Sequence, residues 1–542
     1  MSYAPETRRR RTFAIISHPD AGKTTLTEKL LLFSGAIQIA GAVKGRKASR
    51  HATSDWMEIE KQRGISVASS VMQMLYREHV INLLDTPGHK DFSEDTYRVL
   101  TAVDSALMVI DAANGVEAQT RRLIEVCRQR DTPIITFVNK MDREVRDPLD
   151  ILDEVERELG MPCVPMTWPV GQGKSFGGII NLRTQAMTVF DSGSERLPQD
   201  FETIPLTEQA QLAERFGLEW QTAMDSMELA TGASPAFDEA AFLAGKQTPV
   251  FFGSGVNNFG VMEVLDALVD LAPPPRPRTS NLLVNKQPVV KEIQPEDSAF
   301  SGVVFKVQAN MDANHRDRIA FVRMASGKYT PGMKLKVQRT GKELRPTSVV
   351  TFLSQRREAV DEAYAGDIIG FTTHGGVQLG DTITDGANLQ FTGLPFFAPE
   401  LFMTVILKNP LRTKQLQTGL DQLGEEGAIQ VFKPEIGGPM LLGAVGQLQF
   451  EVVQHRLKAE YDCDVRLEGC QYTGARWITA DTPAELREFT NAYPQRMSLD
   501  AAGTLAYLCT SPYDVRLAQE RFPKIHFHPL REHAGLALGS AG

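Results

Sequence analysis

The sequence predicts an α/β domain, then an antiparallel β-barrel, then a C-terminal α+β domain of split βαβ type. In the first half, apolar strand-like runs alternate with amphipathic helical stretches, which indicates a mostly parallel sheet covered by helices. After the proline-rich LAPPPRPRTSN, short alternating runs are separated by Gly and Pro turns, as in a small barrel. From PELFMTVIL onward, strands and helices follow in mixed order. We expect domains at residues 1–275, 276–395 and 396–542.

Length and composition indicate a chain of several globular domains. At ~100 to 200 residues per domain, 542 residues correspond to roughly three. The formal net charge of -9 excludes a polybasic nucleic-acid coat, so RNA would be met through local patches. The five cysteines are scattered with no CxxC pair, which indicates a reducing compartment and no metal cage. No apolar run approaches the ~20 residues of a membrane span, so we expect a cytoplasmic protein without a membrane partner.

SHPDAGKTT, residues 17–25, follows the strand-like TFAII and precedes the helical TLTEKLLLFSG. It departs from the pattern GxxxxGK(S/T) because Ser17 stands at the position of the first glycine. In a strand-loop-helix unit of this kind, backbone amides cradle phosphates, Lys23 meets the outer phosphates and Thr24 binds Mg²⁺. The context favours a phosphate-binding loop over a chance match.

DTPGH, residues 85–89, follows the strand-like VINLL. At this strand end Asp85 would hold Mg²⁺ through water, the Gly88 amide would approach a terminal phosphate, and His89 would orient an attacking water. Taken alone, the same letters also describe a simple tight turn.

NKMD, residues 139–142, ends the strand-like PIITFV and predicts which base is bound. The Asp142 carboxylate can accept both the ring N–H and the exocyclic amine of guanine, a donor pair that adenine lacks. Asn139 and Lys140 would support the loop and cover the base, and an amide at Ser254 or Gly255 would meet the guanine carbonyl. A kinase that uses an adenine nucleotide is therefore disfavoured.

SHPDAGKTT, DTPGH, NKMD and the pair Ser254–Gly255 all lie at the carboxyl ends of predicted parallel strands, where such sheets bind ligands. They predict a P-loop GTPase domain. Because more than a hundred residues separate NKMD from GSG and loops of that length rarely lack structure, we also expect an inserted subdomain around residues 165–245. The predicted GTP/GDP-binding residues are Ser17, Asp20, Ala21, Gly22, Lys23, Thr24, Thr25, Asp85, Asn139, Lys140, Asp142, Ser254 and Gly255. The predicted catalytic residues are His89, Lys23 and Gly88.

With these motifs in this order, the chain resembles the translational GTPases. By that resemblance SDWMEIEKQRGISV is the first switch, and Ser66 takes the place of its usual threonine. Pro19 and Ile65 would then form an apolar gate beside His89. The metal-binding set implied for Mg²⁺ is Thr24, Ser66 and Asp85.

The resemblance continues beyond the first domain. The pairs Gly366–Asp367 and Gly380–Asp381 resemble the second domain of translational GTPases, and GQLQF from Gly446 resembles a domain that follows it in some members. GAVKGRKASRHATSD, before the first switch, is either a solvated loop or a segment whose basic residues meet ribosomal RNA. Those basic residues are Lys44, Arg46, Lys47 and Arg50. HFHPLREHAGLALGSAG, residues 526–542, is expected to be a frayed tail.

The resemblance is strongest to the family members that act in translation termination. It implies a ribosome-stimulated GTP hydrolase whose partner is a ribosome carrying a class I release factor, and which promotes dissociation and recycling of that factor. No GGQ tripeptide occurs, so cleavage of peptidyl-tRNA is not expected. Two alternatives stay open: a truncated elongation- or rescue-type GTPase, and a GTP-dependent ribosome-binding scaffold. We expect a monomer.

Overall fold

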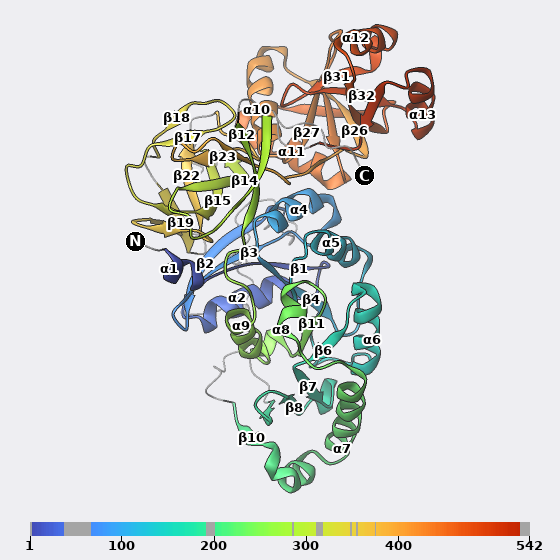
Figure 1. Ribbon diagram of the computed structural model, residues 1–542. Coiled ribbons are helices and arrows are strands. Elements are labelled where there is room, and N and C mark those ends of the chain that lie inside the picture. Colours follow the sequence, from blue (N-terminus) through green and yellow to red (C-terminus); the bar gives the residue numbers. More distant parts are fainter. Residues whose placement is uncertain are drawn as a thin grey trace.

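The computed structural model describes residues 3–36, 67–190, 201–284, 287–309, 318–346, 349–353, 356–373 and 376–531. In Figure 1 the blue-to-green first half of the chain forms a layered α/β body, the yellow part a barrel-like body, and the orange-to-red part a third body beside it. The expectations for Ser66, for Ile65 and for the basic residues between 44 and 50 lie outside the described ranges.

A seven-stranded sheet forms the centre of the first body, in the order β2-β3-β1-β4-β5-β11-β6. Neighbouring strands are parallel except β2 and β3, which are antiparallel. Its strands are β1 (Arg10–Ser17), β2 (Ser70–Tyr76), β3 (His79–Asp85), β4 (Ser105–Asp111), β5 (Ile134–Asn139), β6 (Cys163–Pro165) and β11 (Thr248–Phe252). The helices of this body are α1 (Ala4–Arg8), α2 (Lys23–Phe33), α4 (Ser93–Thr101), α5 (Ala118–Gln129), α6 (Pro148–Leu159), α8 (Glu239–Leu243) and α9 (Val261–Asp270).

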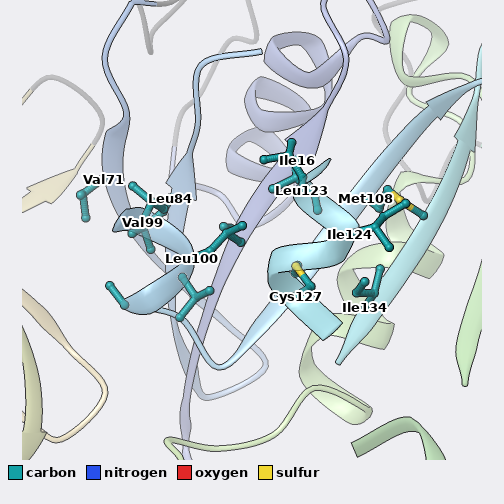
Figure 2. Close-up of a cluster of buried hydrophobic side chains, with 14 of the residues drawn as sticks. Ile16, Val71, Leu84, Val99, Leu100, Met108, Leu123, Ile124, Cys127 and Ile134 are labelled. Atoms are coloured by element: carbon teal, nitrogen blue, oxygen red, sulfur yellow. The ribbon is translucent and has the colours of Figure 1, made fainter. Parts of the chain in front are cut away.

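Both faces of this sheet are buried, which explains why its strands are apolar throughout. Successive side chains of a strand point to opposite faces, so Phe13 packs in one buried cluster with residues of α2 and α9, while Ile16 packs in another with residues of α4 and α5. Figure 2 shows the second cluster, where Leu123 and Cys127 of α5 lie over the sheet residues Ile16 and Met108. The carboxyl ends of the parallel strands are thereby held at one edge.

Between β5 and β11 the chain forms an additional antiparallel sheet in the order β10-β9-β8-β7. Its strands are β7 (Thr167–Val170), β8 (Gly178–Asn181), β9 (Ala186–Val189) and β10 (Thr203–Pro205). The long α7 (Gln209–Ala233) packs on it, with Trp220 buried and the Trp168 indole donating to Ser226 Oγ at 3.0 Å. In Figure 1 this unit lies at the end of the first body remote from the barrel.

The second body is antiparallel and barrel-like, as predicted. An eight-stranded sheet in the order β18-β17-β23-β14-β15-β22-β19-β20 is accompanied by the three-stranded β13-β12-β24 and the pair β16-β21. The strands are β12 (Arg278–Val284), β13 (Gln287–Ile293), β14 (Ser301–Ala309), β15 (Arg318–Ser326), β16 (Lys328–Tyr329), β17 (Leu335–Val337), β18 (Glu343–Leu344), β19 (Val349–Leu353), β20 (Arg356–Ala359), β21 (Ala363–Tyr364), β22 (Ile368–Thr373), β23 (Thr382–Thr384) and β24 (Leu389–Phe391). Phe305, Phe321 and Ile369 are buried in its interior.

The third body is built from two successive βαββαβ units that share one eight-stranded antiparallel sheet, in the order β29-β26-β28-β27-β31-β32-β30-β33. The first unit is β26 (Leu401–Leu407), α10 (Thr413–Glu425), β27 (Gln430–Pro434), β28 (Leu441–Ala444), α11 (Gln447–Tyr461) and β29 (Val465–Gly469). The second unit is β30 (Gly474–Ala480), α12 (Pro483–Ala492), β31 (Met497–Asp500), β32 (Leu505–Cys509), α13 (Pro512–Arg521) and β33 (Ile525–His528). The predicted split βαβ type is confirmed, and the structure adds that the unit occurs twice.

The prediction of a frayed tail from residue 526 is wrong for its first six residues. All of them except Pro529 belong to β33, which pairs with β30, or to β34 (Leu530–Arg531), which pairs with β25 (Phe396–Phe397). Arg531 is buried, forms an ion pair with Asp500 at 2.7 Å and lies over the Phe396 ring. These partners lie far away in sequence, so composition alone does not reveal them.

Within the described ranges, no helix combines the length and the apolar character that crossing a membrane requires.

Candidate active site

The loop between β1 and α2 has a backbone shape that places its amides at the start of a helix. Asp20 and Gly22 both have positive φ, 64° and 95°. A Cβ atom at Gly22 would lie 2.3 Å from Asn139 Nδ2, so this position has room only for glycine. Asn139 Nδ2 donates to the Ala21 carbonyl at 2.8 Å, which ties this loop to the end of β5.

A cavity of about 460 Å³ lies at the carboxyl ends of the parallel strands. It brings together most of the predicted residues from four separate segments of the chain. Those that line it are Ser17, Asp20, Gly22, Lys23, Thr24, Thr25, Gly88, His89, Asn139, Lys140, Asp142 and Ser254. Ala21, Asp85 and Gly255 do not line it but contact residues that do. Pro19, the predicted gate residue, also lines the cavity.

Lys23 and Asp85 form a buried ion pair beneath the cavity, with side chains 7% and 2% exposed. Lys23 Nζ contacts Asp85 Oδ1, while Asp85 Oδ2 is buried without a hydrogen-bond partner among the described residues. A buried carboxylate oxygen without a donor is costly unless a cation or an ordered water satisfies it. The arrangement therefore fits a magnesium ion with bound water, which Asp85 and Thr24 would hold.

His89 follows the turn after β3 and reaches the cavity with a side chain that is 36% exposed. Its Nδ1 accepts a hydrogen bond from the Asp91 amide at 3.3 Å and lies 3.3 Å from Asp91 Oδ1. The other carboxylate oxygen of Asp91 accepts from the Leu448 amide at 2.8 Å, at the first turn of α11. The C-terminal body thus touches the segment that carries the predicted water-orienting histidine.

The predicted base-recognition residues form one connected group. Asn139 Oδ1 accepts from the amides of Lys140 and Gly255, each at 2.9 Å. The Gly255 amide is thus engaged by Asn139 in this structure, and an amide of Ser254 or Gly255 at the guanine carbonyl stays a prediction. Ser254 Oγ donates to Asp142 Oδ1 at 2.5 Å, which orients this carboxylate at the cavity wall.

Asp111 and His18 belong to this neighbourhood and were missed in the sequence. Asp111 ends β4 and pairs with Lys140 Nζ at 2.7 Å. Burial acts to raise the pKa of Asp111, but hydrogen bonds from Lys140 and the Ala113 amide outweigh it and lower the pKa. His18 is buried, with Nδ1 3.3 Å from Glu117 Oε1. The position of Asp111 at the end of the apolar SALMVI was the available signal.

Comparisons with known proteins divide the chain in the same order as the structure. Residues 8–274 match the elongation factor Tu GTP binding domain, residues 299–386 match elongation factor G domain 2, and residues 391–519 match the class II release factor RF3 C-terminal domain. A crystal structure of a protein from Thermus thermophilus is similar with a TM-score of 0.67 and 25% identity, covering 87% of this chain and 69% of that one.

Together with the cavity, these matches define a translational GTPase, an enzyme that hydrolyses GTP. The chain is 65% identical over 540 residues to peptide chain release factor 3 of Bordetella avium, covering 99% of each chain. It is 63% identical over 544 residues to the protein of the same name from Nitrosomonas europaea, covering 100% of each. The chain belongs to the peptide chain release factor 3 family, whose GTPases act in translation termination.

Proposed function

We propose that the protein uses GTP to promote dissociation and recycling of class I release factors from terminated ribosomes, and that it acts as a cytoplasmic monomer. The observation that carries the proposal is the single cavity lined by residues of the SHPDAGKTT loop, of DTPGH and of NKMD together with Ser254. In the GTP state the protein remodels the ribosome, and it leaves after hydrolysis removes the terminal phosphate that holds the switches. We also propose the domain limits 1–275, 276–395 and 396–542.

We assign a separate role to each group of residues in and beside the cavity wall. Lys23 and the amides of the 17–25 loop hold the phosphates, and Asp142, supported by Ser254, reads guanine. Thr24 and Asp85, with Ser66 outside the described residues, would hold Mg²⁺, which supplies positive charge against the phosphate oxygens. His89 orients the attacking water, and the Gly88 amide faces the terminal phosphate.

Ribosome dependence has a physical basis in the position of His89. Its ring nitrogen is engaged by the Asp91 amide, and a third of the side chain faces solvent. A partly exposed ring needs a further contact to be fixed beside the terminal phosphate. We propose that the ribosome supplies this contact and so stimulates hydrolysis.

The test is multiple-turnover GTP hydrolysis with ribosomes stopped at a stop codon and carrying a class I release factor, while departure of that factor is followed. His89→Ala should retain GTP binding and lose about 10²-fold or more of the ribosome-stimulated rate. The exposed neighbour Lys90 provides the control Lys90→Ala, which should turn over normally. Unchanged turnover of His89→Ala would refute the role of His89, and binding without stimulation of the wild type would favour a scaffold.

A further inference from the structure

A second cavity, of about 410 Å³, lies where the first body, the following linker and the barrel meet. Its wall includes Arg130, just after α5, Arg276 of the linker, and Arg278, the first residue of β12. Thr392 and Gly393, which follow β24, complete this side of the wall. None of these residues belongs to the nucleotide cavity. A volume of this size is within the usual range of small-ligand sites, about 300–1,000 Å³.

The wall of this cavity carries excess positive charge. Arg276 donates to the Asp131 carbonyl at 2.7 Å, and Arg278 donates to the Thr101 carbonyl at 2.7 Å. Arg130 donates to the Gly393 carbonyl at 3.1 Å. The carbonyl oxygens hold the guanidinium groups of Arg276 and Arg278 in place, and a carbonyl carries no formal charge that could neutralise a guanidinium group.

Among the described residues that line the cavity, Asp104 alone carries a carboxylate, and it is already engaged. Its Oδ2 pairs with Arg323, which lies behind the wall, and its Oδ1 accepts from the Arg276 amide at 3.1 Å. Burial, and then the positive charge of Arg323, lower the pKa of Arg278 to about 9, although Asp104 acts to raise it. An anion inside the cavity would relieve this repulsion.

We propose that the arginine cavity, formed around Arg130, Arg276 and Arg278, binds a phosphate group. Guanidinium groups present planar pairs of N–H donors that match phosphate oxygens. Arg276 and Arg278 present two such groups beside a carboxylate, Asp104, that already pairs with Arg323. Thr279 and Thr392 line the same cavity and carry hydroxyl groups that can donate hydrogen bonds. The phosphate comes either from a small phosphorylated molecule or from an RNA backbone.

The first arm of the test titrates inorganic pyrophosphate into the full chain saturated with GDP, so that the nucleotide cavity is occupied, and measures heat. Wild type should bind, and the double variant Arg276→Gln, Arg278→Gln should bind at least about tenfold more weakly. Arg128→Gln, on the exposed side of α5, is the matched control and should bind as wild type does. Retained GDP affinity shows that each variant is folded.

A second variant leaves the arginines of the wall in place. Thr279 is exposed at the cavity wall, so Thr279→Glu places a carboxylate among the guanidinium groups, while Thr279→Gln adds the same bulk without charge. Thr279→Glu should abolish pyrophosphate binding, and Thr279→Gln should weaken it less. Equal binding by wild type, the double variant and Thr279→Glu would place the anion elsewhere and overturn the proposal.

The second arm distinguishes the two sources by measuring ribosome affinity over a salt series. If RNA supplies the phosphate, Thr279→Glu should bind ribosomes more weakly, with a slope of log affinity against log salt reduced by about one. If a small molecule supplies it, Thr279→Glu should lose pyrophosphate binding while its ribosome affinity equals that of wild type. If wild type itself does not bind pyrophosphate and Thr279→Glu binds ribosomes as wild type does, the site is refuted.

Discussion

In the proposed site, selection of the base depends on the carboxylate of Asp142. It accepts from Ser254 Oγ at 2.5 Å, which leaves its other oxygen and remaining lone pairs for the two guanine donors. Because hydrogen bonds to a charged group contribute about 1.5–3 kcal/mol, their loss is large on the scale of nucleotide affinity.

We expect Asp142→Asn to lower GTP affinity by about 10- to 100-fold, because the amide presents a donor where guanine also has one. The affinity for xanthosine triphosphate should rise, because xanthine has a carbonyl acceptor in place of the exocyclic amine of guanine. Competition of both nucleotides against a fluorescent GDP measures this. Asp150→Asn, an exposed carboxylate near the start of α6, is the control. An unchanged preference would mean that another group reads the base.

At the level of elements, the N-terminus of α11 is the point where the C-terminal body meets the segment after β3. The Leu448 amide donates to Asp91 Oδ2 at 2.8 Å, and a Cβ atom at Gly446 would lie 1.9 Å from Asp91 Cγ. The carboxylate therefore caps the helix from another domain, as an N-cap side chain does within one.

We expect Gly446→Ala to push Asp91 away from the helix and to remove this capping bond, which is worth about 1 kcal/mol. The Leu448 amide should then exchange its hydrogen about fivefold faster, as measured by hydrogen exchange of the full chain. Gly469→Ala is the control, because a Cβ at that position meets nothing within 4 Å. Unchanged protection of Leu448 would show that the interface tolerates the methyl group.

The N-terminus of α13 provides a pH-dependent element. Burial acts to raise the pKa of Asp514, but bonds from the Thr510 hydroxyl and amide, and then the pair with Arg496, lower the pKa to about 2. A carboxylate with a lowered folded-state pKa stabilises the fold above its unfolded pKa of about 3.9, and this contribution is lost as the pH falls toward 2.

We therefore expect Asp514→Asn to be less stable than wild type at about pH 6, and the difference in free energy of unfolding to shrink as the pH falls toward about 3. Urea denaturation of both proteins across this range measures the difference. A difference that does not change with pH would contradict the assigned role of the charge.

At the scale of the whole molecule, Arg323 links the barrel to the first body. Its side chain is 1% exposed, pairs with Asp104 and also contacts Thr12 Oγ1 and the Gly366 carbonyl. Arg10 and Asp367 form a second buried pair across the same interface, at 2.8 Å. Buried ion pairs of this kind fix the relative orientation of two domains, because any other orientation would leave a buried charge without its partner.

We expect Arg323→Met to lower the free energy of unfolding by about 3–5 kcal/mol, because it leaves the Asp104 carboxylate buried without its partner. Urea denaturation followed by a probe in each body should show the transitions of the two bodies separating. Arg77→Met removes an exposed pair with Asp266 and should cost less than about 1 kcal/mol. A similar small loss for Arg323→Met would show that the interface does not depend on this pair.

Local pattern in the sequence was enough to specify the strands and the motifs that follow them. The apolar runs became the strands of the central sheet, and the phosphate-type loop, DTPGH, NKMD and the 254–255 turn all follow those strands because strand and turn signals are short-range. The fold class is confirmed for the same reason. Parallel strands of one sheet have their carboxyl ends at the same edge. Once these strands were assigned, the sequence therefore also indicated that the residues following them would gather in one cavity, and most of them do.

The features whose partners are distant in sequence became visible only in the folded chain. Arg531 is ordered by Asp500 and Phe396, and the C-terminal units share one sheet through pairing of β27 with β31. The contact of Asp91 with α11 and the meeting of Arg130 with Arg276 and Arg278 likewise join residues more than a hundred positions apart. No periodicity encodes such meetings, because they arise from the packing of whole domains rather than from local backbone preference.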